Sequence, residues 1–454
     1  MTISGAPVFV NNAGLCVSSA GVTVAGQPIR FSPTSGGPVL LGNLGTNASG
    51  GAAVLAFGAD QAGAAVGIAE VFADGNTAGS RAVCWNAGAI EPTQLGQGTY
   101  RSACAYAINA AGMVAGIALD SNNTYALRWQ SGTYAVLNNA GLGTGGRMYS
   151  RAVAMNEAGT VVGHGEVTLG GVVYDRALRW NAGGTGVTVL GFTWTNPSTT
   201  YDSQAVAINA AGIVVGHATA DDEGRRPVRW DASGTATELG NLGLSWGSTY
   251  ITPVAINDAG TAVGNAHNYA QSSSKVDRAV RWDASAVAAT ELGNLGTDVL
   301  GITTTNVYKL SNTGVIVGYA LKYSGGVSQG EHAVMWGLDG NAVDLNTLID
   351  PAGGWTLTRA KAISPDGQWI AGEGKYDPDG AGPLLAYFRL WVMSVSNPAD
   401  FNGDGKVNGR DFLAWQSHYP MLSGAAKTDG DANGDGKVNG QDFLIWQTQY
   451  KPGL

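Results

Sequence analysis

The sequence predicts a mostly β protein of eight similar units, followed by a small helical domain at the C-terminus. Two observations support this prediction: a strand-turn-strand motif recurs at regular intervals before residue 395, and a twelve-residue acidic loop occurs twice after it. The composition agrees, because 69 of the 454 residues are glycine and 13% are charged, against about 25% charged residues in typical domains. Many tight turns and closely stacked sheets suit such a composition.

The repeated motif reads Ala-Ile-Asn-Ala-Ala-Gly-Met-Val-Ala-Gly at residues 107–116, and close copies begin at Ala154, Ala207 and Ala255. Including looser copies, the turn glycines lie 47 to 54 residues apart, at Gly14, Gly63, Gly112, Gly159, Gly212, Gly260, Gly314 and Gly367. This period defines eight units. Each unit continues with a second pair of short strands, so we expect one four-stranded antiparallel meander per unit.

A four-stranded sheet cannot bury both of its faces alone, whereas radial stacking of similar sheets covers them. The repeat therefore predicts an eight-bladed β-propeller. The last unit shows no clear fourth strand before residues 394–398. We therefore expect the N-terminal strand at residues 7–10 to pair with this unit and close the ring. The expected domains are a propeller at residues 1–395, a linker at 396–399 and a helical domain at 400–454.

The acidic loop begins at Asp400 and again at Asp431, with the same residue classes at every position that could bind a metal ion. Calcium prefers six to eight oxygen ligands, which positions 1, 3, 5, 7, 9 and 12 of such a loop can supply. Gly405 and Gly436 stand at position 6, where the loop must turn sharply. The pattern predicts two calcium ions, with position 7 contributing only its main-chain carbonyl. The predicted ligands are Asp400, Asn402, Asp404, Lys406, Asn408 and Asp411 in the first loop, and Asp431, Asn433, Asp435, Lys437, Asn439 and Asp442 in the second.

Each loop runs into a short amphipathic segment, beginning at Phe412 and Phe443, and no helix is expected before either loop. A duplicated loop-helix unit that ends its loop with Asp resembles the type I dockerin module, over about residues 398–450. The resemblance implies a module that folds on calcium and docks into a cohesin domain of another protein. The alternative is that the ions only stabilise a domain too small to bury much core.

The chain departs from the dockerin pattern at one place. Members of that family often carry Ser or Thr just before the twelfth position, at the surface that contacts the partner. Here the corresponding pairs are Gly409-Arg410 and Gly440-Gln441. The calcium positions are unaffected, but the identity of a cohesin-like partner stays open.

The repeats also carry a family resemblance. The Ala-Ile-Asn-x-x-Gly-x-Val-Val-Gly motif, an Ala-x-x-Trp strand and Leu-Gly-Asn-Leu-Gly follow one another over most of residues 50–345. This pattern resembles the HAF repeat of bacterial extracellular proteins. The resemblance implies a secreted or surface protein and no particular reaction.

Charge and hydropathy narrow the classes of partner. The formal net charge is −9 and the sequence pI is about 5.0, which offers no basic surface for nucleic acid. No apolar run reaches the roughly 18 to 20 residues of a membrane helix. The chain begins without a signal-peptide pattern, so we expect a leader to have been removed or the start to be misplaced. Weak calcium loops favour an extracellular or cell-surface location.

The binding surface of the propeller is predicted from its loops. First and third turns of each unit are short and uniform, whereas the second turns and the connections between units are long and varied, and variable loops on a rigid scaffold often bind ligands. Aromatic side chains collect in these long connections and could bind sugar rings or peptide side chains. The candidate ligand-binding residues are Trp194, Tyr201, Trp246, Tyr250 and Trp355. The alternative is that these rings only pack the loops.

Two other features are expected to have a structural role rather than a metal-binding or reactive one. His164 and His217 follow the Val-Val-Gly strand in successive units, so they should be neighbours, but two histidines without a third ligand are weak evidence for a metal. Cys16, Cys84 and Cys104 fall at different places in the repeat. They are expected to be buried small residues, with a bridge between Cys84 and Cys104 as the alternative.

Two classes of function remain. One is a secreted, non-catalytic binding or adhesion protein; the other is a polysaccharide hydrolase or lyase attached to a complex through its dockerin-like module. Glycoside hydrolysis usually needs two carboxylates either about 5 Å or about 6.5 to 9.5 Å apart, and the expected inner strands carry almost no Asp or Glu. No Ser-His-Asp order, phosphate loop or zinc spacing is present. The sequence favours the binding protein and indicates no catalytic residue.

Overall fold

The computed structural model describes residues 7–19, 27–33, 37–141, 146–169, 171–191, 202–220, 224–242, 249–269, 275–380, 382, 384–395, 399–402, 407–432 and 436–450. The chain divides into two compact units, Met1–Ser394 and Val395–Leu454. No helix of the described residues is long and apolar enough to cross a membrane.

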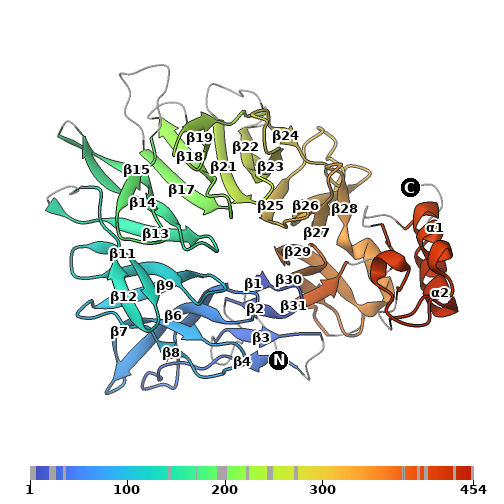
Figure 1. Ribbon diagram of the computed structural model, residues 1–454, viewed down its shortest axis with the longest axis horizontal. Helices are drawn as coiled ribbons and strands as arrows, with labels where there is room; N and C mark the ends of the chain where they lie inside the picture. Colours follow the sequence, from blue (N-terminus) through green and yellow to red (C-terminus); the bar gives the residue numbers. More distant parts are fainter. Residues whose placement is uncertain are drawn as a thin grey trace. The chain divides into compact units, whose positions relative to one another are not determined.

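The first unit is a series of antiparallel meanders (Figure 1). The first four are β1 (Pro7–Val10), β2 (Cys16–Ser18), β3 (Ile29–Phe31) and β4 (Val39–Leu40); β5 (Val54–Ala59), β6 (Ala65–Ala73), β7 (Asn76–Trp85) and β8 (Thr93–Gln94); β9 (Ser102–Ile108), β10 (Val114–Leu119), β11 (Thr124–Gln130) and β12 (Thr133–Val136); and β13 (Ser150–Met155), β14 (Val161–Leu169), β15 (Val172–Trp180) and β16 (Val187–Val189). The others are β17 (Asp202–Ile208), β18 (Val214–Ala220), β19 (Gly224–Trp230) and β20 (Ala236–Glu238); β21 (Thr249–Ile256), β22 (Ala262–Tyr269), β23 (Lys275–Trp282) and β24 (Thr290–Glu291); β25 (Thr305–Leu310), β26 (Ile316–Ser324), β27 (Val327–Trp336) and β28 (Ala342–Asp344); and β29 (Trp355–Ile363), β30 (Trp369–Tyr376) and β31 (Tyr387–Ser394).

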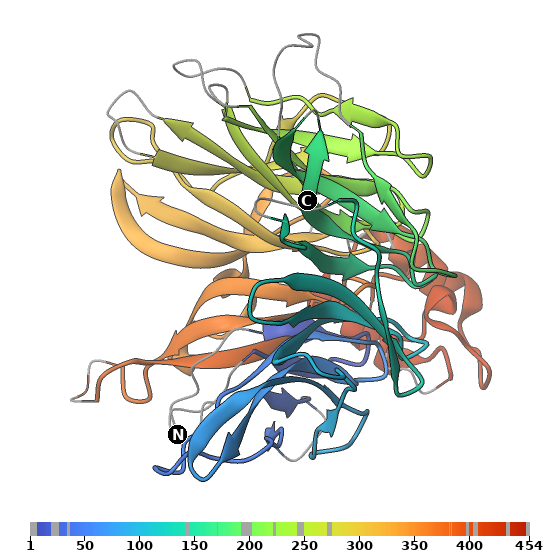
Figure 2. The same cartoon turned by 90° about the vertical axis from the view of Figure 1, so that its left-hand side faces the viewer.

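These meanders are arranged around a ring. The first strands contact one another in a closed series, β1, β5, β9, β13, β17, β21, β25, β29 and back to β1. Figure 1 shows first strands such as β13, β17 and β29 on the inner side of the ring, and Figure 2 shows consecutive sheets lying face against face. The mostly β, propeller-like fold that the repeat predicts is therefore confirmed.

The hydrogen-bonded sheets do not match the meanders one to one. Within the described residues there are seven sheets, because Gly224 and Arg225 of β19 pair in parallel with Thr249 and Tyr250 of β21. This pairing joins the fifth and sixth meanders into one eight-stranded sheet. The last sheet, β29 to β31, has three strands.

The ring closes by packing and not by the expected strand pairing. β1 is hydrogen-bonded to β2 in its own sheet, because the turn at Asn11 and Gly14 folds the two into a hairpin like those of the other units. Side chains of β1 and β2, including Cys16, pack on Ala362 and Ala371 of the last sheet. The expectation that residues 7–10 supply a fourth strand to the last sheet is wrong.

The asparagine of the repeated motif links successive first turns. Asn156 accepts a hydrogen bond from the main-chain N–H of Thr160 at 2.9 Å and donates from Nδ2 to the carbonyl oxygen of Asn209 at 3.1 Å. Asn209 donates likewise to Asn257 at 3.0 Å, and Asn257 to Ser311 at 3.2 Å. A buried amide needs partners for its donors and its acceptor. The asparagine of the motif therefore holds neighbouring sheets together through these hydrogen bonds.

In six of the eight meanders, a tryptophan of the third strand joins its sheet to the preceding one. Nε1 of Trp230 donates to the carbonyl oxygen of Gly191 at 2.7 Å, and Nε1 of Trp282 donates to that of Gly240 at 2.9 Å. Six buried tryptophans follow this pattern: Trp85, Trp129, Trp180, Trp230, Trp282 and Trp336. In the last sheet, the buried Nε1 of Trp391 has no hydrogen-bond partner among the described residues.

The cysteines are structural. Cys16, Cys84 and Cys104 are buried, and each is a free thiol in the described part of the chain. Burial raises the pKa of Cys84 and of Cys104 to about 11 and raises that of Cys16 well above its usual value. The expectation of buried small residues is confirmed, and the alternative bridge is not formed.

The second unit contains two equivalent helices, α1 (Gly409–His418) and α2 (Gly440–Gln449). A short 3-10 helix, η4 (Lys427–Asp429), lies before the second loop, so the expectation that no helix precedes either loop is wrong for that loop. Apolar side chains from both loops and both helices form one small core around Phe401, Val407, Ala432 and Ile445.

Candidate calcium loops and ligand-binding face

The structure describes eight of the twelve predicted calcium ligands. These are Asp400, Asn402, Asn408, Asp411, Asp431, Lys437, Asn439 and Asp442. The other four, Asp404, Lys406, Asn433 and Asp435, lie outside the described residues.

Position 12 of each loop connects the beginning of the loop to the first turn of its helix. The side chains of Asp411 and Asp442 are fully buried. Asp411 Oδ1 accepts from the main-chain N–H of Phe401 at 2.8 Å, and its Oδ2 accepts from that of Asn408 at 2.9 Å. Asp442 makes the equivalent contacts in the second loop at 2.9 and 2.8 Å. Each carboxylate therefore closes its own loop.

Position 9 is the N-cap of each helix. The side-chain oxygens of Asn408 and Asn439 accept from the main-chain N–H of Arg410 and Gln441, both at 2.8 Å. With the carboxylate three residues later, each asparagine completes a capping box. The two loops thus enter their helices with the same backbone geometry, at φ −143° and −144°.

The donor chemistry of the loops fits calcium. Position 1 is also buried, since Asp400 and Asp431 are 8% and 5% exposed, and Asp431 Oδ2 accepts from the main-chain N–H of Gly436 at 2.8 Å. Buried carboxylates are costly unless they are hydrogen-bonded, paired or bound to a metal, and oxygens are the ligands that calcium prefers. Among the described residues no group of three His, Cys, Asp or Glu side chains could hold an ion. Only two of the three aspartates of each loop fall in that part of the chain.

The two halves of this unit are held together by a symmetrical aromatic cluster. Nε1 of Trp415 donates to the carbonyl oxygen of Asn439, and Nε1 of Trp446 donates to that of Asn408, both at 3.1 Å. The ring of Trp415 lies 5.1 Å from that of Phe443. The ring of Trp446 lies 5.0 Å from that of Phe412. Each helix therefore packs on the other and reaches the other loop.

Sequence reasoning did not single out the exposed leucines of the helices. Leu413 is 61% exposed and Leu444 is 58% exposed. Each directly follows a phenylalanine of the aromatic cluster, Phe412 or Phe443. Arg410 and Gln441, from the pairs that depart from the dockerin pattern, are exposed as well. The sequence could have indicated the two leucines, because the two Phe-Leu-x-Trp segments place a leucine at the same position twice.

Comparison with protein-family models matches residues 398–448 to the Dockerin type I domain. The chain therefore ends in a type I dockerin domain. The comparison with curated proteins gave no match.

Three solved structures to which the chain is similar share 11 to 15% of its sequence. A puromycin hydrolase is 15% identical with a TM-score of 0.39, over 84% of this chain and 51% of that one. A GH74 xyloglucanase from Xanthomonas campestris is 11% identical with a TM-score of 0.42, over 85% and 66%. The SapL1 lectin in complex with alpha methyl fucoside is 12% identical with a TM-score of 0.34, over 64% and 96%. The chain spans about half to two thirds of the first two structures.

The propeller presents two different faces. Arg128 Nη1 donates to the carbonyl oxygens of Gly159 and Asn181, at 3.4 and 3.0 Å, which belong to the first and third turns of the next sheet. These turns therefore lie on one face. The opposite face carries the second turns and the connections between sheets, and we call it the long-loop face.

The predicted aromatic residues are only partly described. Trp194, Tyr201 and Trp246 lie outside the described residues. Tyr250, in β21 at the long-loop face, is 39% exposed. Trp355 begins β29 at the same face, but its ring packs 5.1 Å from that of Tyr376. The role of the five aromatics in ligand binding stays a prediction.

The two histidines have structural surroundings. His164 Nδ1 lies 2.7 Å from Asp175 Oδ2, which also accepts from Gln204 Nε2 at 2.7 Å. His217 is 5% exposed. Burial, with the nearby charges of Arg225 and His164, lowers the pKa of His217 to about 4. Neutral, buried His217 and His164, which contacts Asp175, therefore belong to the packing of the sheets.

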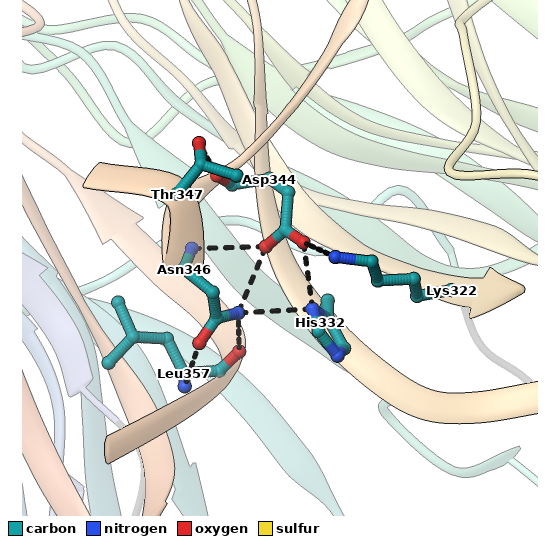
Figure 3. A network of polar contacts seen from close by, with 6 residues as sticks. All are labelled: Lys322, His332, Asp344, Asn346, Thr347 and Leu357. Carbon is teal, nitrogen blue, oxygen red and sulfur yellow. Dashed lines mark hydrogen bonds and ion pairs between the residues drawn. The ribbon is translucent and has the colours of Figure 1, made fainter. Parts of the chain in front are cut away.

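A polar network fixes the last two sheets against each other (Figure 3). Buried Asp344 accepts from Lys322 Nζ and contacts His332 Nδ1, each at 2.9 Å. Burial would raise the pKa of Asp344, but hydrogen bonds from His332, Lys322 and Asn346 hold it well below its usual value. Asn346 also bonds both main-chain groups of Leu357, the N–H at 2.7 Å and the carbonyl at 2.9 Å. β29 is thereby tied to the sheet of β26 to β28.

Proposed function

We propose that the chain is a secreted, non-catalytic binding protein that docks through its C-terminal domain to a cohesin-like domain of another protein. The observation that carries this proposal is the duplicated loop-helix unit of the type I dockerin domain, with buried aspartates at both ends of each loop. The propeller then presents a glycan or protein ligand-binding face. HAF-type repeats and an extracellular or cell-surface location form part of this proposal.

Calcium is the proposed switch for docking. Two ions would be held by the twelve predicted loop residues, and each ion would neutralise three clustered aspartates. Because Asp411 and Asp442 also cap their helices, loop order and helix order are coupled. Metal binding should therefore order the surface that contacts the partner.

The exposed sides of the two helices are the proposed docking surface. Leu413 and Leu444 supply apolar contact area, while Arg410 and Gln441 stand where related domains often carry Ser or Thr. Arg is enriched among the residues that dominate the energy of protein interfaces, and the buried centre of an interface is more apolar than its rim. We expect this unusual pair to select a cohesin-like partner different from those that recognise hydroxyl side chains.

The enzymatic alternative finds little support in the propeller. Glu331 and Glu373 share a pocket at the long-loop face, but both accept hydrogen bonds from Arg359. A hydrolase needs one carboxylic acid that protonates the leaving group. Arg359 instead occupies both oxygens of Glu331 with a bidentate contact.

The test is binding of the whole chain to immobilised type I cohesin domains, measured by surface plasmon resonance in calcium and in chelator. We expect binding by at least one cohesin in calcium and none in chelator. Leu413→Ala combined with Leu444→Ala should abolish binding, whereas Leu385→Ala, an exposed apolar residue of the propeller, should not. Binding that persists in chelator would contradict the proposal, and so would hydrolysis of a polysaccharide by the purified chain.

A further inference from the structure

A pocket of about 510 Å³ opens between the last two sheets at the long-loop face. It is lined by the beginning of β27, the beginning of β29, the end of β30 and the beginning of β31. A second pocket of about 500 Å³ lies at the equivalent place between β7, β9 and β10. Such pockets therefore arise where a second turn meets the first strand of the next sheet.

Most of the residues that line the first pocket are polar or charged. They include two carboxylates, Glu331 and Glu373, and three cations, Arg359, Lys375 and Arg389. Pockets for apolar small molecules are lined mainly by hydrophobic side chains, so this pocket suits a ligand with many hydrogen-bonding groups. The two carboxylates offset all but one of the three cations, so the lining does not favour a strongly charged ligand.

The carboxylates are held in fixed positions. Arg359 contacts Glu331 through Nε at 2.6 Å and through Nη2 at 2.8 Å, and it reaches Glu373 through Nη1 at 3.3 Å. The guanidinium group also lies 5.3 Å from the centre of the Tyr319 ring. Each carboxylate oxygen retains lone pairs beyond those used by Arg359. A ligand would therefore meet acceptors that need little further ordering on binding.

An aromatic ring and an ammonium group stand on the same face of the sheet as Glu373. Lys375 and Phe388 are register partners in β30 and β31, and Lys375 Nζ lies 5.8 Å from the centre of the Phe388 ring. Glu373 precedes Lys375 by two residues in the same strand, so its side chain points to the same face. Phe388 is 51% exposed. None of the lining residues of the second pocket is aromatic.

We propose that this pocket binds a neutral sugar unit of a polysaccharide, with the sugar ring on Phe388. Sugar hydroxyls both donate and accept hydrogen bonds, so Glu331 and Glu373 would accept from them and Lys375 would donate to them. The flat ring of Phe388 provides a face for the C–H groups of the sugar. This assignment rests on the proposed binding function of the propeller and names its ligand class.

The experiment is affinity gel electrophoresis of the whole chain in calcium, in gels containing xyloglucan, galactomannan, polygalacturonate or poly-glutamate. The variants are Phe388→Ala and Lys375→Gln, each checked for fold by circular dichroism. Leu385→Ala is the matched control, since it removes an apolar side chain that is 89% exposed and lies three residues before Phe388 in the sequence but is not part of the pocket lining. We expect retention by at least one neutral polysaccharide, weakened about tenfold by Phe388→Ala and clearly weakened by Lys375→Gln.

The outcomes separate this assignment from the proposed function. Retention that Phe388→Ala and Lys375→Gln leave unchanged would overturn the pocket while leaving a glycan-binding propeller in place. Retention only by polygalacturonate or poly-glutamate would overturn the neutral sugar and favour an anionic ligand. Retention by none of the four polymers would overturn the pocket as a polysaccharide site, while calcium-dependent cohesin binding could still be observed separately.

Discussion

Trp415 and Trp446 make reciprocal hydrogen bonds, each from its indole N–H to the main-chain carbonyl of the residue that caps the other helix. The donor-acceptor distance is 3.1 Å in both cases. Each loop is therefore supported by the helix of the other repeat. The two acidic loops should consequently become ordered and disordered together.

The reciprocal bonds give the first prediction. Trp415→Phe and Trp446→Phe should each lower the free energy of unfolding of the C-terminal domain by about 1 kcal/mol, because each leaves one carbonyl without its donor. Thermal unfolding followed by circular dichroism in calcium would measure the change. A loss in one variant and none in the other would contradict the symmetrical arrangement.

Calcium removal should unfold the C-terminal domain without affecting the propeller. Without metal, three aspartates repel one another in each loop, so residues 396–454 should lose helical signal in chelator and recover it in calcium. Asp404→Ala combined with Asp435→Ala should prevent the recovery and remove partner capture. Asp429→Ala, which changes an aspartate outside the ligand positions, is the control. A domain that stays helical in chelator would show that calcium is dispensable.

The predicted aromatic residues of the long-loop face give the third test. Trp246→Ala combined with Tyr250→Ala should abolish retention on a glycan or cell-wall matrix, since each stacked ring contributes on the order of 1 kcal/mol beyond area burial. Circular dichroism would check that the fold is intact. Unchanged retention would show that these rings only pack the loops.

Acid should destabilise the propeller through His217. The pKa of this histidine is about 4 in the folded chain and 6.5 in the unfolded chain, so the unfolded state binds more protons between those values. Above pH 6.5, His217 therefore does not lower the free energy of unfolding. As the pH drops toward 4, the free energy of unfolding falls by about 3 kcal/mol in total. Urea unfolding of wild type and His217→Gln at several pH values would measure this. The exposed His418→Gln is the control, and an equal pH dependence in all three proteins would refute the assignment.

The motif asparagines should be important for stability. Asn209→Ala leaves the main-chain N–H of Ile213 and the carbonyl of Asn257 without their present partners, which should cost about 1 to 3 kcal/mol for each buried group. Urea unfolding would measure the loss. Ser233→Ala, in an exposed third turn of the same meander, should have little effect, and similar losses in both variants would argue against the link between sheets.

By itself, the sequence determined the repeated strands and the duplicated loops, because turn glycines, alternating strands and ligand spacing are local patterns. It also determined the location of the dockerin domain, since Asp400 to Asp411 and Asp431 to Asp442 repeat one chemistry. Only the tertiary structure decided how the ring closes: β1 keeps its hairpin with β2 and packs on the last sheet. Only the tertiary structure assigned Asn156 and Trp230 to links between sheets, and placed Glu331, Arg359 and Phe388 around one pocket. The hydrogen bonds of Asn156, Trp230 and Arg359 join residues that are 28 to 53 positions apart in the sequence. No local pattern specifies which distant partner a side chain meets.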